Sequence, residues 1–398
     1  MSGKTIAFPP KLQYNDSGKK HTYFIKSGEN MIQKLSAFLK KEAVFSVALL
    51  LAVVSAFLVP PSADYIDYID FRSLGLLLAL MLTVAALQKQ GLFVAAGNAL
   101  LKRVRSVRQL AAVCILLPFF TSMFITNDVA LLTFVPFAIA LLKLCGATRL
   151  CCPVVILQTV AANLGSMLTP LGNPQNLYLY SRSGMPIGRF LLLMLPYTAV
   201  SLALLLVSIL LLKGRSSVSF SAETVKLRPR GILLPAALFL VCLLAVVNLI
   251  PWYAALGAVV LALLIADRSL FKKADWFLLL TFVCFFIFVG NMSRIPEIHG
   301  FLQNIIAGNE LPTAIVSSQV ISNVPAAVLL SGFTERLDRL IVGTNLGGLG
   351  TLIASMASLI SFRFYSAEAP NGRGRYLGYF TLVNLLFLAV LFGFTFAF

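Results

Sequence analysis

Runs of about 20 apolar residues recur along most of the chain and are separated by short polar segments. A helix of about this length crosses the hydrocarbon core of a lipid bilayer. The runs are uniformly rich in Leu and Ala, and they lack the alternation of apolar and polar residues that is typical of outer-membrane barrels. The pattern therefore predicts an all-α polytopic membrane protein.

About nine of these runs are predicted to cross the membrane completely, because each is long enough for one helix. The predicted spans are 43–59, 71–87, 150–180, 190–212, 231–249, 252–266, 276–292, 340–365 and 376–398. Segments 110–142 and 312–333 are predicted instead as re-entrant helical hairpins, since the first is short for two crossings and a turn. Segments 91–108 and 296–309 are predicted as helices that lie on the membrane surface.

Polar residues interrupt both hairpins near their middle. Segment 120–136 is broken by Thr126, Asn127 and Asp128, and the second hairpin is broken by Ser322 and Asn323. An acid inside an apolar stretch is unusual, because a charge at membrane depth costs roughly 2.5 kcal/mol or more. Asp128 is therefore predicted to have a function.

Two of the spans contain stretches that break a helix. Residues 169–176 are rich in Pro and Gly, and residues 344–351 are rich in Gly. A broken helix in lipid exposes backbone groups, which is tolerated only in a protein-lined or wet cavity. Both stretches are predicted to be unwound and to lie beside such a cavity.

The order of these features occurs twice along the chain. The matching pairs are 69–71 with 274–276, 125–137 with 321–333, 163–169 with 345–351, and 188–190 with 374–376. We predict two repeats, 43–230 and 252–398, joined by the span 231–251 and preceded by a basic cytoplasmic tail, 1–42. The charges of the loops predict that equivalent spans of the two repeats cross the membrane in opposite directions. The repeats are therefore predicted to be inverted, as in secondary transporters.

The net charge of +17 alone would suggest a nucleic-acid partner. The Lys and Arg residues lie instead in short loops and in the first 42 residues, where they orient a membrane protein. Only 12% of the residues are charged, against about 25% in soluble proteins. We therefore expect a bilayer and no nucleic acid as partner, with the N-terminus in the cytoplasm and the C-terminus on the outer side of the cell (inner) membrane.

Residues for catalysis or for a metal site are scarce. The two histidines, His21 and His299, lie outside the predicted spans, and the six cysteines show no CxxC spacing. The sequence contains neither an HExxH motif nor a nucleotide-binding P-loop. We expect no enzyme activity, catalytic residue, metal or cofactor, apart from a coupling ion.

The polar breaks provide a candidate site if the repeats bring them together. Helix N-termini attract anions, and freed carbonyls attract cations. The predicted substrate-binding residues are Thr126, Asn127, Asn173, Pro174, Asn176, Ser322, Asn323, Asn345 and Gly347. The predicted cation-coupling residues are Asp128, Asn127, Gly172, Asn323, Gly348 and Thr351. The alternative is that these residues only pack and kink helices, as small and polar residues do in membranes.

These motifs resemble the ion transporter superfamily, which includes divalent-anion/sodium symporters, citrate transporters, arsenite permeases and sodium/proton antiporters. The tips 126–128 and 322–324 look like the paired Ser-Asn-Thr tips of that superfamily, and TPLGNPQN resembles its unwound Gly-Thr-Pro-Pro-Asn segment. SQVISNVPAA followed by GTNLGGLGTLIAS is most similar to anion permease members. The resemblance covers nearly everything after residue 43, and it implies an elevator mechanism, a homodimer, and substrate and cation sites at the tips.

The tips also depart from the superfamily pattern. Thr126 stands where Ser is common, and Asp128 and Val324 stand where Thr is common. An acid beside the tip asparagine resembles the arsenite-permease branch. We predict a secondary active transporter of a small anion, a carboxylate or an inorganic oxyanion, coupled to Na⁺ or H⁺. The alternatives are a sodium/proton antiporter or an arsenite-type permease of the same fold, and a channel.

Overall fold

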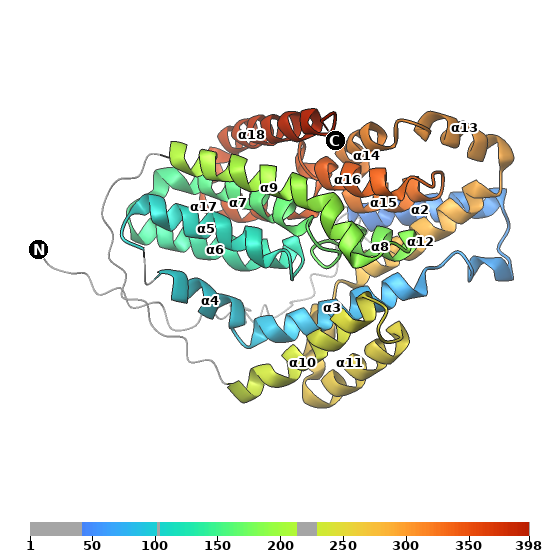
Figure 1. Ribbon diagram of the computed structural model, residues 1–398, viewed down its shortest axis with the longest axis horizontal. Coiled ribbons are helices and arrows are strands. Elements are labelled where there is room, and N and C mark those ends of the chain that lie inside the picture. The colour runs from blue at the N-terminus through green and yellow to red at the C-terminus, as the bar shows by residue number, and fades with distance from the viewer. Residues whose placement is uncertain (1–41, 102–103, 213–228, 398) are drawn as a thin grey trace, which may run out of the picture.

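The structure is a computed structural model that describes residues 42–101, 104–212 and 229–397. Within these ranges every regular element is a helix, which confirms the predicted fold class (Figure 1). Three predicted features lie largely or wholly outside the described residues. The first is the basic tail 1–42, of which only Glu42 is described. The others are Lys102 and Arg103, at the end of the first surface helix, and most of the polar loop 213–230. The orientation inferred from them stays a prediction.

Among the described residues, the first half of the chain contains eight α-helices in the order that the apolar pattern predicts. They are α2 (Ala43–Leu58), α3 (Phe71–Lys89), α4 (Leu92–Leu101), α5 (Val107–Thr121), α6 (Asn127–Leu144), α7 (Cys151–Ser166), α8 (Pro174–Ser183) and α9 (Ile187–Leu211). Helices α5 and α6 form the first hairpin, and α7 and α8 are the two parts of the first broken helix.

The second half continues with nine α-helices. They are α10 (Pro229–Val246), α11 (Trp252–Ala266), α12 (Trp276–Ser293), α13 (Pro296–Ile306), α14 (Glu310–Ile321), α15 (Asn323–Ser331), α16 (Leu337–Gly347), α17 (Met356–Glu368) and α18 (Arg373–Phe394). Short 3₁₀ turns occur at 63–65, 148–150, 268–273, 352–354 and 370–372. Helices α14 and α15 form the second hairpin, and α16 and α17 form the second broken helix.

The breaks overlap the predicted unwound stretches but are shifted by a few residues. The predicted unwound stretches were 169–176 and 344–351, whereas the chain between the helices is 167–173 and 348–355. Asn345 and Gly347 are therefore helical, and Pro174 begins α8. Glycine is used in α16 for close packing: a Cβ on Gly347 would lie 2.5 Å from the Oγ of Ser318. The glycine-rich sequence therefore indicates close packing of α16 against its neighbour as well as the break that follows it.

Six described helical segments are long and apolar enough to cross a membrane. They are 71–89, 127–144, 148–166, 187–211, 276–293 and 370–394. Helices α2, α10 and α11, which were also predicted as spans, are apolar but shorter than 18 residues in their apolar part. The number of complete crossings stays a prediction.

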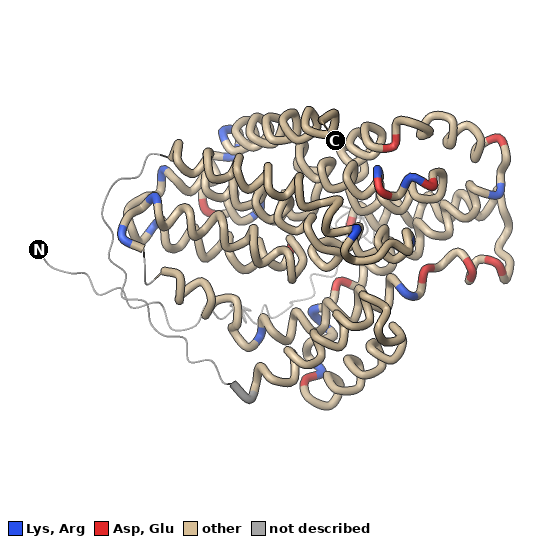
Figure 2. The backbone as a smooth tube through the Cα atoms, in the orientation of Figure 1, with Lys and Arg blue, Asp and Glu red and all other residues tan. Residues whose placement is uncertain are grey.

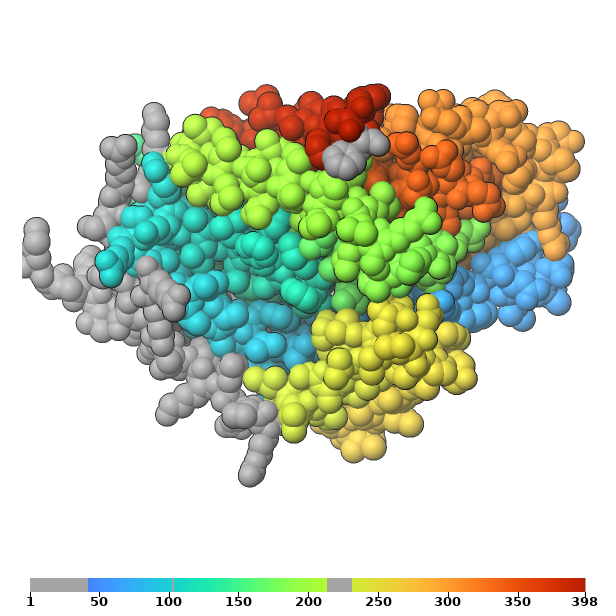
Figure 3. Space-filling view, viewed as in Figure 1, coloured from blue at the N-terminus to red at the C-terminus, as the bar shows by residue number. Residues whose placement is uncertain are grey.

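The first helices of the two predicted repeats exchange partners. Helix α2 packs along α12, and α11 packs with α10 along α3. Figures 1 and 3 show α10 and α11 together below α3, apart from the two hairpins. The first helix of each predicted repeat therefore packs against a helix of the other half of the chain.

Equivalent positions of the predicted repeats make equivalent contacts. Asp70 caps α3 by accepting a hydrogen bond from Ser73 N (2.9 Å), and Asp275 caps α12 by accepting one from Leu278 N (2.9 Å). Thr351 Oγ1 likewise donates to the carbonyl of Gln319 (3.1 Å). In the first half, the matching hydroxyl of Thr169 donates to the carbonyl of Met123. These pairs support the repeat, while its inversion across a membrane is still a prediction.

Charged side chains lie mainly at helix ends and in loops, and long stretches of helix carry none (Figure 2). Arg294, at the end of α12, pairs with Asp64 in the loop before α3 (2.5 Å). This guanidinium lowers the pKa of the Asp64 carboxyl. The pair is exposed to solvent, so it is expected to contribute little to stability.

Candidate substrate site

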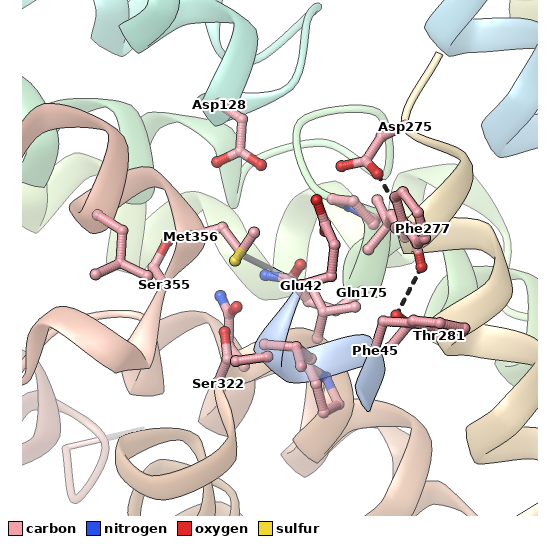
Figure 4. Close-up of a pocket in the computed structure, with 18 of the residues that line it drawn as sticks. Glu42, Phe45, Asp128, Gln175, Asp275, Phe277, Thr281, Ser322, Ser355 and Met356 are labelled. Carbon is pink, nitrogen blue, oxygen red and sulfur yellow. Dashed lines mark hydrogen bonds between the residues drawn. The ribbon is translucent and has the colours of Figure 1, made fainter. Parts of the chain in front are cut away.

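A cavity of about 140 Å³ lies among the starts of several helices (Figure 4). Its walls come from the first residues of six helices, together with Thr281 of α12 and Leu359 and Arg363 of α17. These helices are α2, α6, α8, α12, α15 and α17. Both hairpins and both broken helices therefore contribute to one cavity, as the sequence predicted for the polar breaks.

The four helix starts that the hairpins and the broken helices contribute all lack a side-chain cap. The residues before α6, α8, α15 and α17 are Thr126, Asn173, Ser322 and Ser355, and none caps its helix with its side chain. The first N–H groups of a helix have no partner within the helix, and they carry a positive partial charge. Several such ends around one cavity favour a bound anion, although in α6 the N–H groups of Asn127 and Asp128 already donate to Gly172 O and Asn127 Oδ1.

Asn163 joins the first hairpin tip to the second broken helix. Its Oδ1 accepts hydrogen bonds from Asn127 Nδ2 (2.9 Å) and from Ser355 Oγ (3.1 Å). Its Nδ2 donates to the carbonyl of Gly348 (3.3 Å). All three contacts are buried, so this one amide in α7 fixes the positions of groups from three different elements.

Asn345, the repeat partner of Asn163, makes the matching connection from the second half. Its Nδ2 donates to Asn176 Oδ1 (2.6 Å), and its Oδ1 accepts from Asn173 Nδ2 (3.3 Å). Both partners belong to the first broken helix. The two halves of the chain are therefore held together at the cavity by reciprocal asparagine contacts.

Glycines let the backbone approach closely beside this network. The carbonyl of Gly172 accepts a hydrogen bond from Asn127 N (3.1 Å), which ties the first tip to the first break. A Cβ on Gly172 would lie 2.1 Å from the carbonyl oxygen of Ser166. A Cβ on Gly348 would lie 3.0 Å from the Nδ2 of Asn323 at the second tip. Larger side chains at either glycine would push the tips away from the breaks.

Gln175 is the most unusual residue of the cavity wall. It is 1% exposed, and neither its amide oxygen nor its amide nitrogen has a hydrogen-bond partner among the described residues. One carboxyl oxygen of Asp128 is buried without a partner as well. Buried polar groups without a partner are rare in proteins, because each costs about 1–3 kcal/mol. They leave hydrogen-bonding groups on the cavity wall that a bound ligand can use.

The charges on the cavity wall are of both signs. The carboxylates of Glu42, Asp128 and Asp275 are directed towards the same space in Figure 4, and Arg363 contributes a cation to the wall. Asp275 is also engaged as the cap of α12. The wall can thus offer an anion one guanidinium and several helix starts, and it can offer a cation or a proton the carboxylates.

The predicted site residues divide into three groups. Asn127, Asp128, Pro174, Ser322 and Asn323 line the cavity. The residues behind the wall, which hold it in place, are Thr126, Gly172, Asn173, Asn176, Asn345 and Gly348. The remaining two belong to neither set: Gly347 packs against Ser318, and Thr351 is bound to Gln319.

Several residues of the site were not predicted as such. Asn163 could have been found, because it is the repeat partner of Asn345. Gln175 could have been found as well, because it stands between the predicted residues Pro174 and Asn176. Asp275 and Arg363 lie at the ends of other segments, and their sequence context gives no sign that they face the cavity.

Comparison with known proteins gives one matching family model. Residues 31–339 match the model of the citrate transporter family. The inner membrane protein YbiR of Escherichia coli is 34% identical over 82% of this chain and 88% of its own length. A protein of Methanocaldococcus jannaschii named as an uncharacterised transporter is 31% identical over 73% of this chain and 80% of its own length.

A shorter match is found with a plant protein. The silicon efflux transporter LSI3 of Oryza sativa is 35% identical over 32% of this chain and 26% of its own length. This match covers too little of either protein to transfer a whole activity.

Proposed function

The chain belongs to the citrate transporter family, and from this premise we propose that it is a secondary active transporter of a small anion. Membership of the family makes it a multi-pass membrane transporter rather than an enzyme. The finer assignments are the proposal: the inner membrane as its location, a carboxylate or an inorganic oxyanion as the substrate, and Na⁺ or H⁺ as the coupling ion.

The convergence of four uncapped helix starts on one cavity carries the proposal. These ends add positive partial charge to a cavity wall that also carries the guanidinium of Arg363. Arg363 and the free amide of Gln175 add hydrogen-bond donors that suit the oxygen atoms of an anion. The citrate transporter family name and the silicon efflux relative agree with oxygen-rich substrates.

Alternating access would follow from the two similar halves. In the proposed cycle, the hairpins and broken helices move as one unit that carries the anion, in a homodimer with an elevator-type motion. The two halves would be inverted in the membrane, so that each could adopt the arrangement of the other at a small difference in free energy. The reciprocal asparagine contacts support a unit of this kind, because they join the first tip to α7 and join the two broken helices to each other.

An arsenite-type permease or a sodium/proton antiporter is the second candidate. The observation that favours it is Asp128, which lines the cavity and has one buried oxygen without a partner. An antiporter would use this carboxylate as its ion site, whereas an anion transporter would use it for coupling.

Uptake into liposomes tests the proposed function. Purified protein is expected to accumulate a labelled anion against its gradient when a sodium or proton gradient is imposed, and uptake should saturate. Citrate, a dicarboxylate, sulfate and arsenite are the substrates to compare, each with and without sodium. Uptake that runs only downhill and never saturates would instead indicate a channel, and cation exchange without anion uptake would indicate an antiporter.

Asp128→Asn should remove the pH dependence of transport. The substitution keeps the shape of the side chain and takes away the titratable group, while Glu42, Asp275 and Arg363 remain on the cavity wall. We expect rates that vary less than about twofold from pH 5.5 to 8, against about tenfold for the wild type, because one group titrating over this range changes occupancy by about that factor. Initial uptake rates measured across this range check the prediction.

The control is Asp338→Asn, which changes a half-exposed acid outside the cavity wall and should leave the wild-type pH profile intact. An unchanged pH profile in Asp128→Asn would remove this residue from the coupling mechanism.

A further inference from the structure

The second broken helix exposes carbonyl groups that a cation would normally be expected to bind. Residues 348–355 connect α16 to α17, and the carbonyls at the end of α16 have lost their intrahelical donors. Freed carbonyls of this kind are the usual cation ligands in transporters with broken helices. The sequence had therefore placed cation-coupling residues there.

In this protein the carbonyls converge on an amide nitrogen. The Nε2 of Gln319, in α14, lies 2.9 Å from the carbonyl oxygen of Gly347, 2.8 Å from that of Leu349 and 3.2 Å from that of Ile315. An amide has only two hydrogens to donate, yet three oxygens surround this nitrogen. Several carbonyl oxygens around one point are also the arrangement that a small cation prefers.

The other end of the same amide completes the contact. The Oε1 of Gln319 accepts a hydrogen bond from Thr351 N (2.8 Å), and the carbonyl of Gln319 accepts one from Thr351 Oγ1 (3.1 Å). Gly350 passes close by with φ +114°, and a Cβ there would lie 2.2 Å from the Oε1. The backbone is therefore shaped around this one side chain.

The first half uses a different residue for the corresponding task. The position equivalent to Gln319 is Met123, which cannot donate a hydrogen bond. There the Nδ2 of Asn176 lies 3.2 to 3.4 Å from the carbonyl oxygens of Ser166, Met167 and Thr169. Each break thus has one amide nitrogen among three carbonyls, although in the second half the carbonyl of Ile315 belongs to α14 and not to the break.

We infer that Gln319 occupies the position of a bound cation in the second half, so that the tip and the break are held together without sodium. The inference deepens the proposed function and rests on it, because it concerns the coupling ion of that same site. Two carbonyls that had been expected to bind a cation already have protein donors: Gly172 accepts from Asn127 N, and Gly348 accepts from Asn163 Nδ2. Gln319 is a positioning residue here, since it acts through residues 347–351.

The test is the sodium dependence of thermal unfolding, measured on the full-length protein in detergent without substrate. Wild-type protein is expected to unfold at the same temperature in sodium chloride and in choline chloride of equal concentration. Gln319→Glu keeps the length of the side chain but places a carboxylate against the carbonyl oxygens. Its unfolding temperature should fall by several degrees in choline chloride and recover in sodium chloride, because a cation can then bridge the oxygens.

Two further variants make the result decisive. Gln303→Glu makes the same substitution on an exposed position of α13, and it should show no difference between the two salts. Gln319→Met introduces the residue of the first half and leaves the carbonyls open, so sodium should raise its unfolding temperature. This variant decides the question if Gln319→Glu does not fold in either salt.

A saturable stabilisation of the wild type by sodium would overturn the inference, as would sodium indifference in both Gln319 variants. The measurement needs neither substrate nor transport. Failure of anion uptake would therefore not contradict the role inferred for Gln319. Sodium binding by the wild type would not contradict the proposed anion uptake.

Discussion

Gln175→Leu is expected to lower anion uptake at low substrate concentration by roughly 10- to 100-fold without lowering the stability of the protein. The Gln175 amide is buried in the cavity wall and has no partner among the described residues, so the folded protein loses no hydrogen bond when it is replaced. Removing an unsatisfied buried polar group is neutral or stabilising. A bound anion loses its contact with the amide, which is worth about 1.5–3 kcal/mol for a charged partner, or roughly 10- to 100-fold in affinity.

The measurement pairs initial uptake rates at low substrate concentration with thermal unfolding of the same preparations. The matched control is Gln158→Leu. Gln158 is also buried, but its Nε2 donates to the carbonyls of Cys114 (2.8 Å) and Phe134 (3.2 Å). Its replacement should lower stability by about 1–3 kcal/mol. If Gln175→Leu unfolds as early as the control, or transports at the wild-type rate, the amide does not contact the substrate.

Gly165→Ala is expected to prevent the protein from reaching its folded state. Helix α7 crosses α5 at this glycine, and a Cβ there would lie 2.0 Å from the carbonyl oxygen of Phe119 and 2.9 Å from its Cα. Both atoms belong to backbone, so the overlap cannot be relieved by turning a side chain. The two helices must separate. Asn163 lies one half-turn from Gly165 in α7, so it is displaced as well, and its contacts with Asn127 and Gly348 are disrupted.

Overpacking of this kind typically costs 1–3 kcal/mol or more, and the loss of buried hydrogen bonds adds to that cost. We expect little monodisperse protein in size-exclusion chromatography after extraction in mild detergent. Gly378→Ala is the control, since it adds the same methyl group in α18, where a Cβ would meet nothing within 4 Å. That variant should be as abundant as the wild type, and a well-folded Gly165→Ala protein would show that the two helices are not held so closely.

The sequence by itself determined the kind of elements and their order. Apolar runs of membrane length can satisfy their backbone groups only as helices, so run length and composition fixed nearly all helices to within a few residues. The polar interruptions identified the two hairpins and the two broken helices for the same reason. Asn127, Asn323 and Asn345 were predicted as site residues because a polar residue inside such a run is costly and is expected there only if it serves a site.

Only the tertiary structure decided which residues share the cavity and how the breaks are satisfied. The contact between Asn163 and Gly348 joins residues 185 positions apart, and no local pattern encodes such a pair. Gln175 and Gln319 are ordinary glutamines in the sequence, yet the first has no partner among the described residues and the second has its Nε2 within 3.2 Å of three carbonyl oxygens. The difference arises because hydrogen bonding depends on which groups the fold brings within about 3 Å, and periodicity carries no information about contacts between elements.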